Sequence, residues 1–383
     1  MNFIKAKIQK RIQKNKTSLE RLPLKIRSLK LQFSAITGPK RDSRIAFHVI
    51  GGLGDHLLSA KFIRDLTHEL GDIPFDIYTK RPKLAEWIFA ELPNCKNVFH
   101  TSSAIKWVRR HYALYLDLIG FISIRSTNRK LLLHPQYRPM LRLHKALRAQ
   151  SHKLHNFVEK HPDLDGYLGY YTVTKGFKRH TFLHHLANIP YRGERFSVPT
   201  DEGARARFGL EGKRYITISN GYDDTTPTTP DTKVTKVYPY HGQVAALLKQ
   251  ARPDLIIVQV GANTSEPIAS SDLNLINKTT LPEVASIIEH AALHIDNEGG
   301  LVHLAKALGT TSCVVFGPTL PAYFGYDGNI NCAPNQCGGC WWMEGTWMTQ
   351  CIKGDANPTC MYTQDPQLIA SRVLAFLDHP ASA

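Results

Sequence analysis

The sequence predicts an α/β protein built from two Rossmann-like domains. The chain has 383 residues, of which 43% are hydrophobic, and this is enough for two cores of ordinary size. Strand-like and helical segments alternate twice along the chain, as in parallel sheets wound by crossover helices. Two glycine turns each follow a predicted strand and precede a predicted helix. Ligands of such sheets bind at the carboxyl ends of the strands, so we expect a site at these turns.

The first domain is predicted over residues 42–200. Its first strand, residues 44–50, leads into Gly51-Gly52-Leu53-Gly54-Asp55 and then into a helical pattern from His56. Further strands are expected at residues 75–78 and 113–118. The basic segment 125–153 contains two prolines and is expected to be irregular, either as an acceptor-facing insertion or as a solvated helix pair.

The second domain is predicted over residues 201–383 and begins with a linker at residues 201–213. The expected strands and helices alternate as in the first domain. Strands are expected at 215–219, 255–260, 293–295 and 313–316, with helices at 241–250, 281–290 and 301–308. Residues 366–377 are predicted to form a closing amphipathic helix.

The net charge of +16 is concentrated in residues 1–41, which carry twelve Lys or Arg and a single acidic residue, Glu20. Apolar residues recur at helical spacing in this basic arm, which is typical of a helix on an anionic membrane surface. A solvated basic arm is the alternative, and nucleic acid is disfavoured because no recognition motif accompanies the charge. The longest apolar run, residues 112–124, is too short to span a bilayer. We therefore expect a cytoplasmic protein with a peripheral contact to the inner membrane.

The first glycine turn, from Gly51 to Asp55, offers a backbone that a ligand can approach through Gly52 and Gly54. Its spacing is not the G-x-G-x-x-G of dinucleotide enzymes, and the acid expected after the second strand is not evident, so a nicotinamide enzyme is disfavoured. Asp55 stands at the start of the predicted helix. It is either a candidate catalytic carboxylate or a helix N-cap.

The second glycine turn, Glu298-Gly299-Gly300, precedes the helix that contains His303. Backbone N–H groups and the positive end of a helix dipole form an anion site that suits a diphosphate. An acid beside the glycines can hold sugar hydroxyls. His303 lies one turn into the helix and either contacts the same ligand or packs in the core.

Five motifs together resemble glycosyltransferase family 9, the ADP-heptose heptosyltransferases. They occur in the order found in the family and span about 270 residues, which makes the resemblance specific although each motif is weak alone. The motifs are Gly51 to Asp55, Lys236-Val237-Tyr238-Pro239, Lys278-Thr279-Thr280-Leu281, Glu298 to Leu304, and Gly317-Pro318-Thr319. The resemblance implies a GT-B fold, with two Rossmann-like domains facing a cleft.

The resemblance implies specific roles for residues of these motifs. Asp55 matches the general base of the family, and Lys236 matches the lysine that meets the donor phosphates. The remaining donor-site candidates are Glu266, Glu298, Gly299, Gly300, His303 and Thr319. The chain departs from the family at three of the motif positions: Glu298 replaces the usual Asp, Gly299 replaces Ser or Thr, and Tyr238 replaces Trp. Loss of the hydroxyl at position 299 removes one phosphate or sugar contact.

The chemistry follows from these groups. A carboxylate must take the proton of a sugar hydroxyl that attacks an anomeric carbon, and Asp55 is the candidate. Lys236 and the amides of Gly299 and Gly300 can stabilise the leaving diphosphate without a catalytic metal. The predicted reaction is therefore inverting transfer of a heptose, or a related sugar, from an ADP-sugar to a hydroxyl of lipopolysaccharide or another glycan.

Four cysteines, Cys337, Cys340, Cys351 and Cys360, follow a C-x2-C-x10-C-x8-C pattern. Four thiolates so closely spaced are typical of a structural iron or zinc site, and packed reduced thiols are the alternative. Cys332 is a spare that leaves the choice of ligands open. Residues 332–360, hereafter the cysteine finger, resemble the finger of bacterial autotransporter heptosyltransferases, which holds iron.

Three other functions remain open. The cysteine finger favours a protein O-heptosyltransferase that acts on autotransporter Ser or Thr, whereas the lack of a long extra N-terminal domain disfavours it. A non-catalytic sugar-nucleotide or metal-binding protein would retain the donor without releasing ADP. A rubredoxin-like redox protein is the least favoured.

Overall fold

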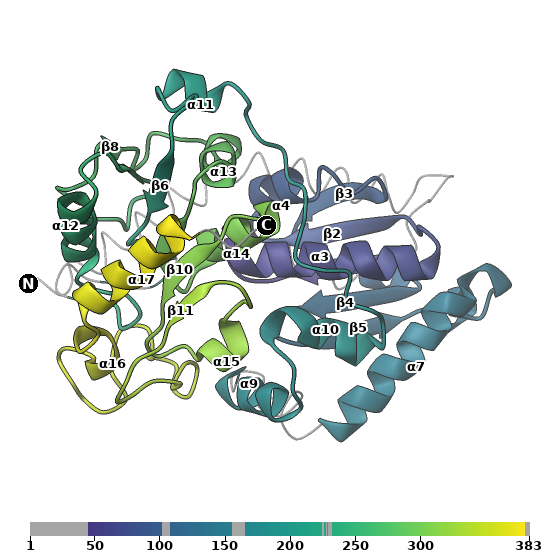
Figure 1. Cartoon of the computed structure of the whole chain (residues 1–383). Helices are drawn as coiled ribbons and strands as arrows, with labels where there is room; N and C mark the ends of the chain where they lie inside the picture. The colour runs from purple at the N-terminus through teal and green to yellow at the C-terminus, as the bar shows by residue number, and fades with distance from the viewer. Residues whose placement is uncertain are drawn as a thin grey trace, which may run out of the picture.

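The computed structural model describes residues 45–101, 108–154, 165–223, 226, 228 and 232–379. The basic arm, residues 1–41, lies outside the described residues, as does the membrane contact predicted for it. Figure 1 shows two α/β halves, each containing its own sheet. The predicted α/β class with two parallel-sheet domains is confirmed.

The N-terminal half contains a five-stranded sheet in the order β3-β2-β1-β4-β5. β1 pairs in parallel with β2 and β4, whereas β5 runs antiparallel to β4. The central position of β1 places the first glycine turn in the middle of the sheet edge. The strands are β1 (Ile45–Val49), β2 (Phe75–Thr79), β3 (Cys95–His100), β4 (Leu114–Leu118) and β5 (Ile122–Thr127).

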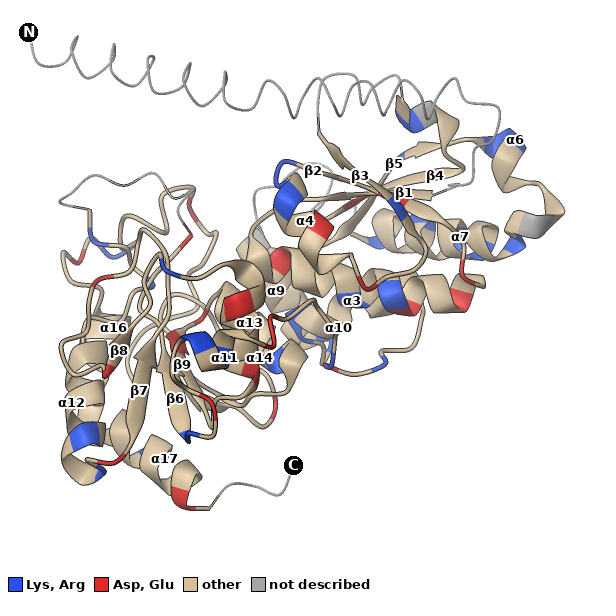
Figure 2. Cartoon of the chain, turned by 90° about the horizontal axis from the view of Figure 1, so that it is seen from above, with Lys and Arg blue, Asp and Glu red and all other residues tan. Residues whose placement is uncertain are grey.

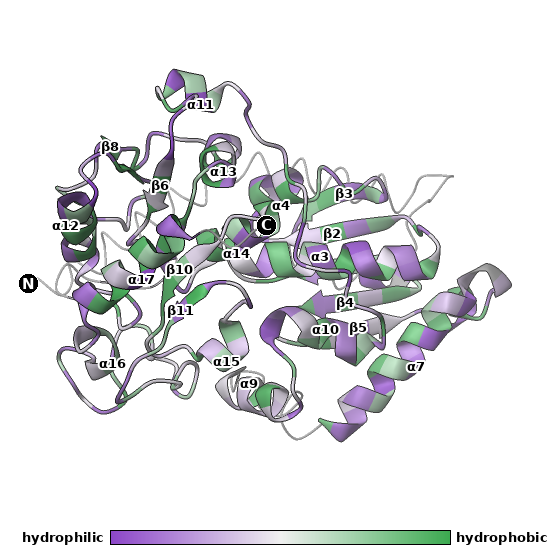
Figure 3. Cartoon of the chain, in the orientation of Figure 1, coloured by the Kyte–Doolittle hydropathy of each residue, from purple (hydrophilic) through white to green (hydrophobic). Residues whose placement is uncertain are grey.

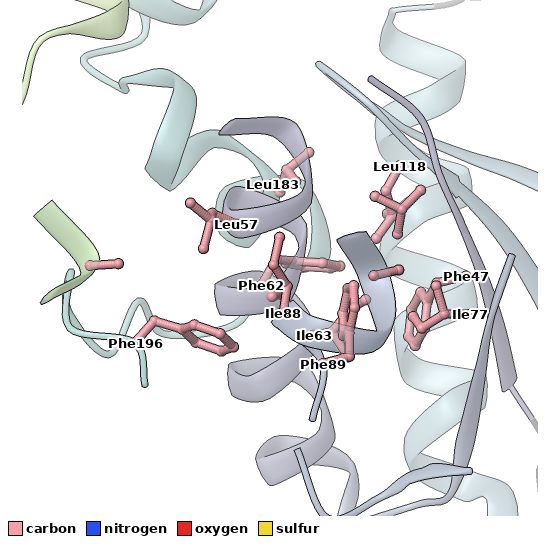
Figure 4. Close-up of a cluster of buried hydrophobic side chains, with 14 of the residues drawn as sticks. Phe47, Leu57, Phe62, Ile63, Ile77, Ile88, Phe89, Leu118, Leu183 and Phe196 are labelled. Atoms are coloured by element: carbon pink, nitrogen blue, oxygen red, sulfur yellow. The ribbon is translucent and has the colours of Figure 1, made fainter. Parts of the chain in front are cut away.

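The longest helix of this half, α3 (Leu53–Leu70), follows β1 directly. Its buried side chains pack against the sheet and against α4 and α10, as Figure 4 shows for Leu57, Phe62 and Ile63. Packing along its whole length fixes the start of α3, which carries the glycine turn. The other helical elements are α4 (Pro82–Ile88), η1 (Arg109–His111), α6 (Arg129–Leu132), η2 (Pro135–Tyr137), α7 (Arg138–Lys153), α9 (Asp165–Thr174) and α10 (Arg179–Ala187).

The C-terminal half contains a six-stranded parallel sheet in the order β11-β10-β9-β6-β7-β8. Buried apolar residues line its central strands, and β10 is coloured as hydrophobic in Figure 3. The strands are β6 (Tyr215–Ile218), β7 (Ile256–Gln259), β8 (Leu273–Asn274), β9 (His294–Asn297), β10 (Ser312–Val315) and β11 (Ile330–Cys332). The helices are α11 (Ala204–Arg207), α12 (His241–Ala251), α13 (Leu281–Glu289), α14 (Gly300–Leu308), α15 (Pro321–Phe324), α16 (Thr359–Tyr362) and α17 (Pro366–Asp378).

The structure differs from two predictions about local structure. The basic segment is regular: it forms the end of β5, then α6, η2 and the 16-residue helix α7, which is closer to the expected helix pair than to an irregular insertion. Pro135 and Pro139 each stand in the first turn of a helical element, where proline lacks only a hydrogen bond that the helix does not need. The helix after β1 begins at Leu53 and not at His56, so Asp55 is its third residue.

Blue bands mark Lys and Arg positions on the ribbon of α6 and α7 in Figure 2, in agreement with the basic composition of this segment. The Lys and Arg residues of α7 lie on its exposed side, while Met140, Leu143 and Leu147 are buried against the N-terminal half. Across the described part of the chain, no helix combines the length and apolar character needed to cross a membrane.

Candidate active site

The turn after β1 brings Asp55 back over the glycines that precede it. Gly51 has φ +108°, a conformation that favours glycine, and a Cβ there would lie 2.0 Å from Oδ2 of Asp55. The N–H of Gly52, the N-cap of α3, donates to Oδ2 of Asp55 at 2.9 Å. Asp55 therefore caps the helix from its third residue, as in a capping box, and its carboxylate lies at the positive end of α3.

Arg179, at the start of α10, forms an ion pair with Oδ1 of the same carboxylate. The Arg179 side chain is 9% exposed and that of Asp55 is 26% exposed. The two carboxylate oxygens are thus held by different donors, and each retains a lone pair for another hydrogen bond. The carboxylate can therefore still accept a hydrogen bond from an incoming hydroxyl.

Lys236 and Glu298 form the corresponding charged pair in the C-terminal half. Glu298 follows β9, and its Oε2 lies 3.0 Å from Nζ of Lys236. Their side chains are 16% and 10% exposed, so both charges lie mostly out of water. Gly299 is the N-cap of α14, whose first N–H groups lie beside this pair. The arrangement provides a cation and a helix N-terminus for an anion.

His303 is buried in α14 between the two halves. Its Nδ1 lies 2.6 Å from the hydroxyl of Tyr326, and its Nε2 lies 3.8 Å from Oε1 of Glu298. Burial, followed by the charges of Lys61 and Arg179, lowers the pKa of His303 to about 3. The imidazole is therefore neutral at pH 7. When the Tyr326 hydroxyl donates to Nδ1, the imidazole proton lies on Nε2 and faces Glu298.

The two glycine turns meet where the halves pack together. A Cβ at Gly54 would lie 2.4 Å from Cδ2 of His303, and one at Gly300 would lie 2.9 Å from Cβ of Leu53. These distances are too short for an added carbon unless a neighbour shifts, so the two helix starts need glycine for their close approach. Both turns therefore belong to one site.

An ion pair between the two halves lies beside the first turn. Arg81, the N-cap of α4, lies 2.9 Å from Oδ1 of Asp223, in the segment after β6. A Cβ at Gly52 would lie 2.6 Å from Oδ2 of Asp223. This pair lies directly over the turn that carries Asp55.

The structure brings most of the predicted site residues together. Thr319, after β10, is 2% exposed, and its buried hydroxyl has no hydrogen-bond partner among the described residues. Such a hydroxyl is suited to a ligand oxygen. The Glu266 side chain is exposed, and the contacts of this residue run through its carbonyl oxygen to Asn220 and Gln259. Its predicted role at the donor stays a prediction.

Three residues of the site were missed by sequence reasoning. Arg179 lies 124 residues from Asp55 in the chain, and no local motif joins them. Tyr326 likewise belongs to none of the recognised motifs. Asp223 could have been found, because it follows the predicted strand 215–219 at the carboxyl end, where ligands bind in such sheets.

The cysteine finger carries free thiols. Burial, followed by the charges of Cys337, Cys340 and Cys351, raises the pKa of the Cys360 thiol to about 12. Within the described ranges, however, no group of three or more His, Cys, Asp or Glu side chains is arranged to hold a metal ion.

Comparison with known proteins bears directly on the motifs. Residues 227–344 match the model of glycosyltransferase family 9 (heptosyltransferase). The predicted resemblance is confirmed. Lipooligosaccharide heptosyltransferase 2 of Haemophilus influenzae is 28% identical over 82 residues, which are 21% of this chain. The matched segment covers only 24% of that relative.

Three solved structures resemble the whole fold. Heptosyltransferase II of E. coli has a TM-score of 0.51 at 14% identity, covering 87% of this chain and 98% of that one. A family 9 glycosyltransferase of Veillonella parvula gives 0.54 at 12% identity, covering 88% and 97%. The iron-containing, dodecameric heptosyltransferase TibC of E. coli, solved with ADP-D-β-D-heptose, gives 0.53 at 12% identity, covering 88% and 77%. The fold is therefore GT-B.

Proposed function

We propose that this chain is an inverting glycosyltransferase that moves a heptose from ADP-heptose to an acceptor hydroxyl. The observation that carries the proposal is the close contact between two different turns, one with a held carboxylate and one with an anion site. Gly54 packs closely against His303 of the second turn. Asp55 is the next residue of α3, so it belongs to the part of the helix that meets the donor side. The match to the family 9 model over residues 227–344 supports the choice of a heptose.

In the proposed reaction, Asp55 acts on the acceptor. Its carboxylate takes the proton of the hydroxyl as that oxygen forms a bond to the anomeric carbon of the donor. The bond between the anomeric carbon and the diphosphate oxygen breaks on the opposite face, and ADP leaves with the electron pair. Attack from the face opposite the leaving group inverts the anomeric configuration.

Lys236 and the start of α14 act on the donor. Negative charge grows on the diphosphate as it leaves, and a preorganised cation and backbone N–H groups stabilise that charge. Glu298 holds Lys236 in place at 3.0 Å and offers its second oxygen to sugar hydroxyls. Neutral His303 can donate a hydrogen bond to the same ligand without adding a second charge.

The proposal is tested with radiolabelled ADP-heptose and two acceptors presented separately. One acceptor is lipooligosaccharide from cells that lack heptose, and the other is an autotransporter passenger protein rich in Ser and Thr. We expect label to move to the glycan, with one ADP released for each sugar transferred. Label on the protein instead would make the chain a protein O-heptosyltransferase. A chain that retains ADP-heptose and releases no ADP with either acceptor is a binder, and the proposal is then wrong.

We also propose that Cys337, Cys340, Cys351 and Cys360 hold iron or zinc. The C-x2-C-x10-C-x8-C spacing of these residues supports the proposal, and all-cysteine sites suit either metal. Four ligands leave no open position, so the metal would be structural. Cys340→Ser should lower metal content and thermal stability together, whereas Cys95→Ser, far away in the sequence, should leave metal content unchanged. Elemental analysis that finds well under one metal per wild-type chain contradicts this.

The basic arm, residues 1–41, is proposed to attach the protein to an anionic membrane surface. Its charge is typical of such contacts, each Lys or Arg contributing about 1 kcal/mol near the surface. Deletion of the arm should abolish salt-sensitive binding to anionic vesicles and leave turnover of a water-soluble acceptor intact. Vesicle binding that survives the deletion would place the contact elsewhere.

A further inference from the structure

Trp341 of the C-terminal half packs against two glycines of α9 in the N-terminal half, where the absence of side chains leaves room for the indole. It follows Cys340 in the cysteine finger and is completely buried. Its ring stacks on Tyr170 of α9 at a centroid distance of 5.3 Å, and on Tyr323 of α15 at 5.6 Å. A Cβ at Gly169 would lie 2.4 Å from Cζ2 of Trp341, so a larger residue at position 169 would displace the indole.

The backbone of the finger is held at the same place. A Cβ at Gly166 would lie 2.2 Å from the carbonyl oxygen of Trp341, and the hydroxyl of Tyr170 donates to the carbonyl of Gly339 at 2.7 Å. Glycine is unfavourable inside a helix, yet α9 carries two at i and i+3, on the face that receives the indole. Helices α9 and α15 lie side by side (Figure 1), and the finger packs against both.

Packed side chains lead from Trp341 to the carboxylate proposed as the base. Phe324, the last residue of α15, meets Trp341 edge to face at 5.4 Å. The guanidinium carbon of Arg179 lies 5.7 Å from the centre of the same Phe324 ring. Arg179 in turn forms the ion pair with Asp55. Three successive contacts therefore join the finger to Asp55.

We propose that Trp341 and Phe324 are positioning residues that hold Arg179 against Asp55. Through them, the cysteine finger would fix the direction of the Arg179 guanidinium on the acceptor side of the site. An arginine has many rotamers, and its guanidinium needs a fixed surface to present one direction. The face of Phe324 is that surface, and Trp341 fixes the ring. The side-chain contacts of Trp341 lead through Phe324 to Arg179 and Asp55 on the acceptor side, whereas its backbone N–H donates to the carbonyl oxygen of Pro318 at 3.0 Å, a contact that a change of side chain retains. The inference rests on the proposed function for its kinetic consequences, whereas its structural consequence stands independently.

The first test is kinetic and uses a matched control. Trp341→Ala should lower kcat at least tenfold with little change in ADP affinity, and Trp341→Phe, which keeps an aromatic ring, should recover much of the loss. Trp342→Ala is the control, because Trp342 is the next residue and is 42% exposed. It should behave as the wild type. Equal losses in Trp341→Ala and Trp342→Ala, or normal turnover in Trp341→Ala, overturn the proposal.

A double-mutant cycle separates positioning from general stability. If Phe324 acts through Arg179, Phe324→Leu should lower kcat severalfold in the wild-type background and cause no further loss beside Arg179→Lys. If the loss of kcat in the double variant equals the product of the two single losses, the two residues act independently, and the proposal is contradicted.

The deciding measurement does not depend on turnover. Hydrogen exchange should rise at the first turn of α10 and at residues 51–56 in Trp341→Ala, and should stay at wild-type level there in Trp342→Ala. Unchanged exchange at both segments overturns the positioning role whatever the enzyme does. A wild type that transfers no sugar, with exchange altered as expected, refutes the proposed function alone.

Discussion

The two glycine turns have the same backbone design and hold their acids differently. Each follows a buried strand, and each has a glycine at the N-cap of the next helix, Gly52 before α3 and Gly299 before α14. Asp55 stands three residues inside its helix and bends back to the N-cap amide, whereas Glu298 precedes its helix and pairs with Lys236.

This difference in position separates the two tasks. The acid inside the helix occupies the helix N-terminus itself, so that end cannot also bind an external anion. The acid outside the helix leaves the N–H groups of α14 available for one. We therefore propose that the first turn acts on the acceptor proton and that the second binds the donor diphosphate.

The largest expected effect comes from removing the first acid. Asp55→Asn keeps the shape and the hydrogen bond to Gly52 but is a far weaker base, so kcat should fall on the order of 10² to 10⁴. The fall is measured by ADP release at saturating donor and acceptor. Near-normal kcat would leave Asp55 as a helix cap, as one sequence interpretation has it.

The close contact between the two turns is tested by adding one carbon atom at Gly54. Gly54→Ala adds a carbon 2.4 Å from His303, so the helix starts must move apart, which should cost about 1–3 kcal/mol of unfolding free energy and lower turnover as well. Gly242→Ala in α12 is the matched control, because no atom lies within 4 Å of its added Cβ. Denaturant titration of both variants measures the difference, and equal stabilities would contradict the close contact.

Lowering the pH should lower the unfolding free energy of the protein through protonation of His303. The pKa of His303 is lowered to about 3 by burial, so the folded state binds the proton less well than the unfolded state, whose pKa is 6.5. Stability is therefore lost as pH falls below 6.5, with a slope of up to about 1.4 kcal/mol per pH unit from this group. Unfolding free energies between pH 6.5 and 4 should depend less steeply on pH in His303→Gln, and should keep the wild-type slope in the surface variant His152→Gln. Parallel curves for His303→Gln and wild type would contradict the assignment.

The smallest expected effect concerns Gly299, where the family usually has Ser or Thr. The backbone is extended, with φ −174°, and a Cβ would meet only the carbonyl of Asn297, at 3.8 Å. Gly299→Ser should therefore fold normally and gain a few tenths of a kcal/mol from a better N-cap. A loss above about 1 kcal/mol in thermal or denaturant unfolding would mean that glycine is structurally required at this turn, as it is at Gly54.

Sequence reasoning located the central strands of both sheets and several apolar helices because their pattern is local, but it did not find the long basic helix α7. The predicted strand 215–219 and helix 281–290 end within one residue of β6 and α13. It missed β3 and β5, which lie at the two edges of their sheet and carry polar side chains on an exposed face. Edge strands of this kind do not form the continuous apolar runs of central parallel strands.

The site was predictable only where a motif marks it. Asp55, Lys236, Glu298 and His303 belong to such motifs. Arg179 and Tyr326 act through contacts made by folding, over separations of 124 and 23 residues from their partners Asp55 and His303. The sequence also suggested a metal site in the finger but gave no sign that Trp341 fits between α9 and α15, because the fit depends on two glycines of a distant helix.

Calorimetric titration with ADP tests the division of tasks most directly. Asp55→Asn should bind ADP within about twofold of the wild type, because its carboxylate acts on the acceptor. Lys236→Met should bind ADP at least about tenfold more weakly, because it loses a charge-assisted contact worth about 1.5–3 kcal/mol. Equal weakening of ADP binding in both variants, or wild-type affinity in Lys236→Met, would contradict the assignment of one turn to the acceptor and the other to the donor.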